Sequence, residues 1–263
     1  MKKIALLLVL GVAFVACSKD GDDGNTPTTP VNKSANLLAT GASANDILSN
    51  ASFTSLVIEV AYVQNFQPTQ ESMDNFVTFL RDHTFKQDIT INYRALPSPG
   101  EETLTLQEIA DLESENRTEY NDGTTLAIYI YFADAPADTD DEATGTVTLG
   151  AVYRNTSMVI HEVTIRQLAA RSAFTSLADV ETATLNHEFG HLFGLVDLGS
   201  PEINPHEDTD SENHCDRSGC LMRAELQFGS GIMSMLESRA GKGVVVPSLD
   251  PECLLDLQAN GGR

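Results

Sequence analysis

The feature that most constrains this chain is the string Asn-His-Glu-Phe-Gly-His-Leu-Phe-Gly-Leu at residues 186–195. On an α-helix, four residues turn through about 400° and rise about 6 Å, so His187 and His191 project from one face. Both imidazoles can then bind one ion, while Glu188 projects to the side, where it can reach a water at that ion. Two neutral imidazoles with an open coordination position suit Zn²⁺. The string therefore predicts a zinc site beside a carboxylate.

The residues around this string predict that it lies on a helix. Between residues 182 and 195, Leu185, Phe189 and Leu192 recur with helical spacing and form one apolar face. This face argues against two solvated histidines on a surface helix. Gly194 supplies a C-terminal stop. A helix that ends shortly after His191 lets the chain turn back and bring in a third ligand.

The string resembles the signature of the metzincin metalloproteases, H-E-x-x-H-x-x-G-x-x-H followed by a Met-turn. Four signature positions are matched, by His187, Glu188, His191 and Gly194. The last position holds Asp197 instead of histidine. A carboxylate is an acceptable zinc ligand, so Asp197 is one candidate for the third ligand.

A second string, His-Cys-Asp-Arg-Ser-Gly-Cys-Leu-Met at residues 214–222, resembles the segment that follows the glycine in archaemetzincins. In those proteins the histidine is the third zinc ligand and the methionine forms the turn beneath the metal. The resemblance makes His214 the first choice for the third ligand and Met222 the Met-turn residue. An insertion at residues 195–213 separates the two strings, as in leishmanolysin-like metzincins. His206 lies in that insertion and is a further candidate ligand.

The metzincin resemblance implies an α+β zincin fold with a mixed twisted sheet, an active-site helix and a smaller C-terminal subdomain. The hydrophobic pattern fits it. Strands are predicted at residues 55–63, 88–96, 125–132, 149–153 and 158–164, and helices at 69–85 and 106–120. In that fold the strand with the free edge could pair with an extended substrate peptide. The candidates for this edge are Gly150, Ala151, Val152 and Tyr153.

The N-terminal residues predict export. Residues 1–16 read as a lipoprotein signal peptide, with a basic start and an apolar stretch too short to span a bilayer. Phe-Val-Ala-Cys at residues 14–17 resembles a lipobox, which makes Cys17 the lipidated residue. Residues 17–33 read as an acidic, disordered tether that resembles the surface-export signal of Bacteroidetes lipoproteins. We expect an outer-membrane lipoprotein of the cell envelope, exposed at the surface and held to the membrane by lipid alone.

Residues 34–263 are enough for one catalytic domain, with an upper subdomain at 34–195 and a lower one at 196–263. The formal net charge of −22 argues against a nucleic-acid partner and against electrostatic attachment to an anionic membrane. The acidic segment 134–144 is a weak candidate for Ca²⁺, since most such runs are solvated loops.

The cysteines leave two interpretations. In an exported protein Cys215 and Cys220 are candidates for a short disulfide. Archaemetzincins instead use these cysteines and a later C-x-x-C pair for a structural zinc. Only Cys253 follows here, so we expect one catalytic zinc ion and no complete second site. The sequence does not indicate a partner for Cys253.

These observations predict a zinc-dependent endopeptidase that cleaves protein or peptide substrates through a metal-activated water. Glu188 is the expected general base. The alternative is a surface lipoprotein that binds protein or glycan and carries a non-catalytic zinc site. Cleavage specificity, latency and oligomeric state do not follow from the sequence.

Overall fold

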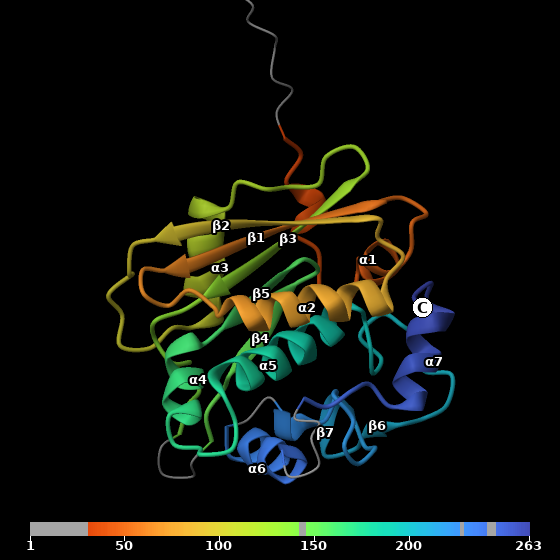
Figure 1. The fold of residues 1–263 in the computed structure, drawn as a ribbon. Coiled ribbons are helices and arrows are strands. Elements are labelled where there is room, and N and C mark those ends of the chain that lie inside the picture. The colour runs from red at the N-terminus through yellow and green to blue at the C-terminus, as the bar shows by residue number, and fades with distance from the viewer. Residues whose placement is uncertain (1–30, 142–145, 227–228, 241–245) are drawn as a thin grey trace, which may run out of the picture. The chain divides into compact units, whose positions relative to one another are not determined.

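A computed structural model describes residues 31–141, 146–226, 229–240 and 246–263 (Figure 1). Residues 1–30 lie outside the described part. The predicted signal peptide, Cys17 and most of the predicted tether therefore lie outside it as well. None of the helices in the described ranges is long and apolar enough to cross a bilayer.

The core of the fold is a five-stranded mixed sheet in the order β2-β1-β3-β5-β4. Its strands are β1 (Ser55–Val63), β2 (Asp88–Leu96), β3 (Thr125–Phe132), β4 (Gly150–Arg154) and β5 (Ser157–Ile160). Neighbouring strands are parallel except for β4, which is antiparallel to β5. The predicted α+β class with a mixed sheet is confirmed. β4 lies at one end of the sheet, so one of its edges has no strand beside it among the described residues.

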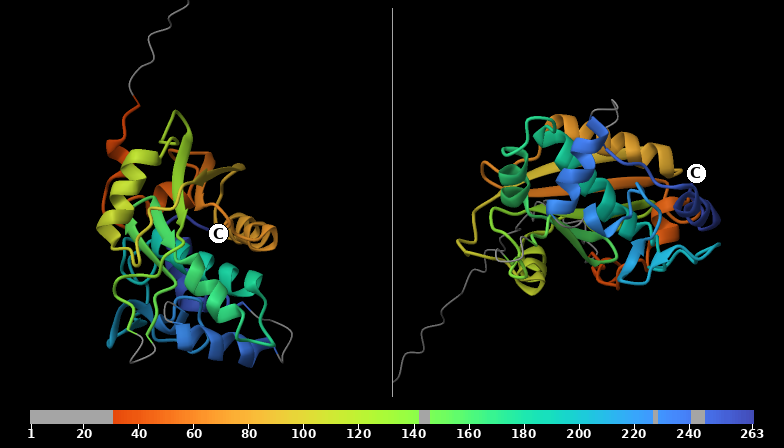
Figure 2. Two further views of the ribbon diagram at one scale, coloured as in Figure 1. Left: turned by 90° about the vertical axis from the view of Figure 1, so that its left-hand side faces the viewer. Right: turned by 90° about the horizontal axis from the view of Figure 1, so that it is seen from below.

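Helices cover both faces of this sheet (Figure 2). On one face lie α2 (Gln70–His83) and α5 (Leu177–Leu192), which pack through an edge-on contact between Phe76 and Phe189. On the other face lies α3 (Leu106–Asn116), whose Ile109 belongs to a second, smaller apolar cluster. The two apolar clusters pack the sheet between layers of helices.

One predicted strand is wrong in its second half. Residues 158–164 were expected to be extended, but β5 ends at Ile160 and α4 (Glu162–Ala169) begins at once, with His161 at its N-cap position. The β-branched residues Val163, Thr164 and Ile165 favour a strand when they are read locally. Tertiary contacts override this preference, because α4 packs against α5 and Glu162 pairs with Arg166 one turn later.

The chain on either side of this core adds small elements. Near the N-terminus lie a 3₁₀ turn (Ser34–Asn36) and α1 (Ala44–Leu48). After α5 come β6 (Glu207–Asp208), β7 (Ser211–Cys215), a 3₁₀ turn (Ala224–Leu226), α6 (Gly229–Ala240) and α7 (Pro251–Ala259). Irregular segments link these elements, and the chain places β7 below the sheet and α7 beside the end of α2 (Figure 1).

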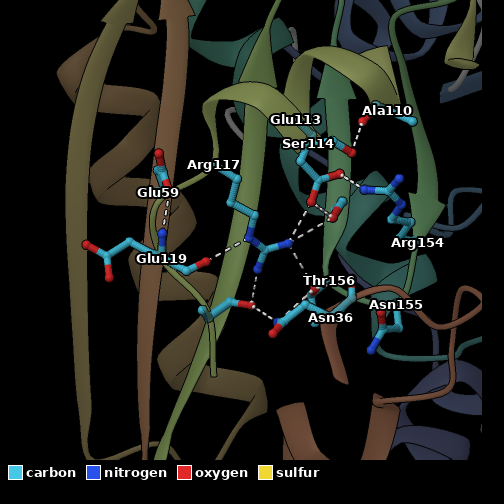
Figure 3. Close-up of polar contacts among 12 residues, drawn as sticks. Asn36, Glu59, Ala110, Glu113, Ser114, Arg117, Glu119, Arg154, Asn155 and Thr156 are labelled. Atoms are coloured by element: carbon cyan, nitrogen blue, oxygen red, sulfur yellow. Dashed lines mark hydrogen bonds and ion pairs between the residues drawn. The ribbon is translucent and has the colours of Figure 1, made fainter. Parts of the chain in front are cut away.

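A buried ion network fastens α3 to the sheet (Figure 3). Arg117 is 4% exposed and donates to Glu113 at 2.7 Å and to the carbonyl of Ala127 on β3 at 2.9 Å. Glu113 also accepts from Arg154 at 2.8 Å. Asn36, which is fully buried, donates to the same Ala127 carbonyl. The network holds the C-terminal end of β4 and the N-terminal segment against one strand, which steadies the free edge of β4.

Candidate metal centres

The helix α5 presents two of the predicted ligands on one face. A capping box between Ser176 and Asp179 fixes its start. Its end is fixed by Gly194, which has φ +74°, a conformation that glycine adopts without strain. The Nε2 atoms of His187 and His191 lie 3.3 Å apart. The helix therefore holds the two imidazoles with their ligating atoms side by side.

The third imidazole comes from β7. The ring of His214 lies 5.4 Å from that of His187 and 5.1 Å from that of His191, and one ligand atom from each ring falls within 4.8 Å of the others. Asn213, directly before it, has φ +61° and thereby turns the chain toward the helix. Of the three candidates, the structure brings His214 to the pair on α5. Asp197 is exposed in a left-handed turn, and His206 lies elsewhere.

Hydrogen bonds orient the rings. His187 places Nδ1 2.7 Å from the carbonyl of Leu221, and His214 places Nδ1 2.9 Å from the carbonyl of Glu212. A carbonyl only accepts, so each Nδ1 carries the proton and each Nε2 presents a lone pair. Burial lowers the pKa of His187 to about 4 and that of His191 well below its usual value. Neutral rings are the form that binds a metal.

The geometry fits zinc. At Zn–N bonds of about 2.0–2.1 Å and tetrahedral angles, two ligand nitrogens lie about 3.3–3.4 Å apart. The 3.3 Å between His187 and His191 agrees with this spacing. Three imidazoles leave the fourth tetrahedral position for another group, which is the arrangement of a catalytic site rather than of a closed structural one.

Glu188 is placed to serve the open position. Its side chain is fully buried, and neither carboxylate oxygen has a hydrogen-bond partner among the described residues. Burial raises its pKa to about 8. The carboxylate packs against β4 at Gly150, where an added Cβ would lie 2.6 Å from Cγ of Glu188. Glycine at this position therefore makes the room that the carboxylate occupies.

Met222 lies beneath the same helix. It is fully buried, and an added Cβ on Gly190 would lie 2.2 Å from its sulfur. Gly190 stands between the two histidines of α5 in the sequence, so the methionine packs directly against the backbone that carries them. The role of Met222 as the Met-turn residue stays a prediction from the resemblance.

A cavity of about 290 Å³ opens beside two of the three histidines, His191 and His214. Glu188, His191 and His214 line it on the metal side, and Ala151 and Val152 of β4 line it on the sheet side. The free edge of β4 thus borders the cavity that contains the metal ligands and the carboxylate. An extended chain lying along that edge would pass over the site.

A second group of metal-ligand side chains lies next to the first in sequence. Cys215, Cys220, Asp250 and Cys253 offer ligand atoms that all lie within 4.8 Å of one another. The candidate disulfide between Cys215 and Cys220 is not formed, because all three cysteines are free thiols. The expectation that a second site would be incomplete counted cysteines alone. It overlooked Asp250, which stands three residues before Cys253, where a cysteine was sought.

The spacing of this group also fits zinc. The sulfur atoms of Cys220 and Cys253 are 3.7 Å apart, and Cys215 Sγ lies 3.5 Å from Oδ2 of Asp250. Two thiolates on one tetrahedral zinc lie about 3.7–3.8 Å apart, from Zn–S bonds of about 2.3 Å. Hydrogen bonds from the thiols of Cys215 and Cys253 lower the pKa of Cys220 to about 3. A thiolate is therefore favoured at the centre of the group.

His206 belongs to the surroundings of this second group. It is 1% exposed, and its Nε2 lies 3.4 Å from Cys253 Sγ and 3.6 Å from Asp256. Its candidacy as third ligand at the histidine site is therefore not supported by its position. The acidic segment 134–141, considered for Ca²⁺, contributes to neither of the two groups, and Glu142 lies outside the described residues.

Comparisons with known proteins find similar structures but no match by sequence. Neither a scan against protein-family models nor a search of curated proteins returns a match. The structure is similar to archaemetzincin from Methanopyrus kandleri, with 17% identity and a TM-score of 0.47 over 80% of this chain and 96% of that one. It is also similar to metalloproteinase-II from Bacteroides fragilis, with 14% identity and a TM-score of 0.41 over 90% and 59%. The chemistry of the site therefore has to follow from its own geometry.

Proposed function

We propose that this chain is a zinc-dependent endopeptidase. The observation that carries the proposal is the convergence of three imidazoles from α5 and β7 beside a buried carboxylate, Glu188, which has no hydrogen-bond partner among the described residues and lines the same cavity as Ala151 and Val152 of β4. His187, His191 and His214 would hold the ion. A purely structural zinc site has four protein ligands and needs no such carboxylate. The open position and Glu188 favour a catalytic role.

The chain's own residues supply the rest of the chemistry. Zinc, when bound, acts as a Lewis acid that activates water and polarises a carbonyl. Glu188 accepts the proton of the attacking water and returns it to the leaving amine. Its burial keeps bulk water from competing for that proton. Backbone groups at the free edge of β4 align the peptide by strand addition.

Replacing Glu188 with glutamine tests this assignment. The Glu188→Gln variant should keep its zinc, because the three imidazoles are intact, and should lose peptide hydrolysis by about 10²–10⁴-fold in kcat, the usual range for a general base. Zinc is measured by elemental mass spectrometry and turnover with a quenched-fluorescence peptide library. The control is Glu212→Gln, whose exposed side chain lies two residues from His214. Full turnover in Glu188→Gln would remove Glu188 from the mechanism.

The alternative is a surface protein that binds protein or glycan and carries a zinc site without activity. It predicts that the zinc-loaded protein cleaves nothing in a mixed peptide library. It also predicts that Glu188→Gln changes no ligand affinity. The position of Glu188 in the cavity beside the free edge favours the peptidase.

We also propose a structural zinc ion at the second group. Four protein ligands would close its coordination shell, with three thiolates and the Asp250 carboxylate. Asp250 also caps α7 through the backbone amide of Cys253 at 2.8 Å. Such an ion would link Cys253 on α7 to Cys215 on β7. Cys215 directly follows His214, so the ion would also hold α7 next to the histidine group.

The lipid anchor remains a proposal from the sequence. Cys17 after a short apolar stretch supports lipidation, and the acidic residues after it support display at the surface of an outer membrane. In cells, radiolabelled palmitate should label the wild-type protein and not Cys17→Ala. Surface display predicts that added protease cleaves the protein on intact cells. Labelling of Cys17→Ala would refute the lipidation site.

A further inference from the structure

Two cavities share a wall beside β4. The cavity at the histidines adjoins a second one of about 230 Å³, lined in part by Leu104, Ala137 and His161. Leu106 and Ala151 line both cavities. The second cavity is therefore an extension of the candidate active site rather than a separate feature of the surface.

The second cavity lies on the side of β4 that faces α3. Val152 packs with the large apolar cluster between the sheet and α5, whereas Ala151 and Tyr153 pack with the smaller cluster on the α3 side. Successive side chains of a strand point to opposite faces. Leu104 belongs to the same α3-side cluster as Ala151, and Leu106 is the first residue of α3.

A peptide added to the free edge of β4 would continue this alternation. Its side chains would point in turn to the α5 face, where the histidines lie, and to the α3 face, where the second cavity lies. The side chain that comes beside Ala151 therefore enters the second cavity. Both cavities meet at Ala151. The substrate residue whose side chain enters the second cavity must therefore be close, in the substrate sequence, to the peptide bond that lies over the histidines.

The walls of the second cavity suit an uncharged side chain. Aliphatic surface comes from Leu104, Leu106, Ala137 and Ala151. His161 is 1% exposed and donates its Nδ1 proton to the carbonyl of Ala135 at 2.9 Å. Burial lowers the pKa of His161, so the ring is neutral at pH 7. Among the described lining residues, only Asp138 carries a charge, and it is exposed to solvent.

We propose that this cavity is a specificity pocket that receives a large uncharged side chain, aliphatic or aromatic, from a substrate residue next to the cleaved bond. The inference rests on the peptidase function proposed above. Ala151 sets the size of the pocket because its single methyl group leaves space at the strand edge. Leu106, which is 45% exposed, forms the wall between the pocket and the histidine site.

The test uses peptides that differ at one residue. Cleavage of a mixed library by the wild-type enzyme first locates the bond and the neighbouring position with a preference. Peptides with Phe, Leu, Ala or Lys at that position are then compared by kcat/KM. Ala151→Leu should lower kcat/KM for the Phe and Leu peptides by tenfold or more and that for the Ala peptide by less than twofold. Leu106→Ala should reduce the difference in kcat/KM between the Phe peptide and the Ala peptide.

Leu255→Ala is the matched control, since Leu255 lies on α7 and its exposure of 42% is close to that of Leu106. Equal losses for all four peptides in Ala151→Leu, or a wild-type preference for Lys, would overturn the pocket. If the wild-type enzyme cleaves no peptide, the proposed function fails. The pocket is then judged by fluorescence anisotropy with zinc-loaded Glu188→Gln. There, adding Ala151→Leu must weaken binding of the Phe peptide selectively, and unchanged binding refutes the pocket.

Discussion

The two groups of metal-ligand residues differ in ways that assign them different roles. The histidine group has three candidate ligands, borders a cavity of about 290 Å³ and lies beside a carboxylate without a hydrogen-bond partner in the part of the chain that the structure describes. The cysteine group has four ligands, and its three cysteines are almost fully buried. An open shell with a neighbouring base suits catalysis, and a closed shell suits structure. The different roles proposed for the two groups therefore rest on their numbers of candidate ligands.

The two groups are nevertheless joined by the chain. His214 of the first is followed directly by Cys215 of the second, and Met222 comes two residues after Cys220. The backbone amide of Cys215 donates to the carbonyl of Met222 at 2.7 Å. A fixed position of the cysteines therefore fixes both the third imidazole and the methionine under α5. A substitution in either group should therefore affect both activity and stability, although to different extents.

The largest effect on catalysis is expected from His191→Ala. Removing one of three imidazoles should empty the histidine site and lower kcat/KM on the order of 10³-fold or more, because activation of water by the metal contributes several kcal/mol. Zinc content should fall by one ion per chain while the cysteine group keeps its own. His83→Ala is the control, because that histidine lies on α2 and belongs to neither group. Retained zinc and turnover in His191→Ala would contradict the assignment.

Cys253→Ser should have the larger effect on stability. It removes one of four ligands and the contact of Cys253 with Cys220, so the zinc content should again fall by one ion. Loss of a structural metal costs on the order of 4 kcal/mol, which corresponds to a decrease in Tm of about 10 °C for a chain of this size. Activity should decrease by less than in His191→Ala, since the three imidazoles remain.

The control for Cys253→Ser is Gln258→Ala, an exposed position on the same helix. Its Tm, measured by differential scanning calorimetry, should stay close to that of the wild type. Unchanged zinc content in Cys253→Ser would show that the cysteine group holds no ion. The histidine group would then be the one remaining candidate metal centre among the described residues.

The elements that the sequence predicted well are those with local causes. The bounds of β1, β2 and β3 agree with prediction, because runs of β-branched and aromatic residues ended by turns mark a strand within a few residues. The placement of His187 and His191 on one face of α5 could be predicted equally well, since a four-residue spacing on a helix fixes the direction of both side chains. Their roles as metal ligands stay predictions.

The elements that the sequence did not predict depend on distant contacts. α4 was missed because its β-branched residues favour a strand until α5 is present to pack against. Asp250 was missed as a member of the cysteine group because it comes 30 residues after Cys220 and also has the ordinary role of a helix N-cap. His214 was the first choice for the third ligand, but Asp197 and His206 stayed open because the path of residues 195–213 has no periodic signal.

The smallest effect should come from pH, and it concerns the packing of α4 against α5, the helix that carries His187 and His191. Burial, and then the charge of Glu181 on α5, raise the pKa of Glu162 to about 9, although Arg166 lowers it. A pKa raised on folding stabilises the folded state fully below about pH 4.5 and loses that contribution as pH rises toward 9. The free energy of unfolding should therefore fall between pH 5 and 9 in the wild type and fall less in Glu162→Gln. Urea titrations at both pH values measure this, with exposed Glu71→Gln as the control, and parallel curves for wild type and Glu162→Gln would exclude Glu162 as the titrating group.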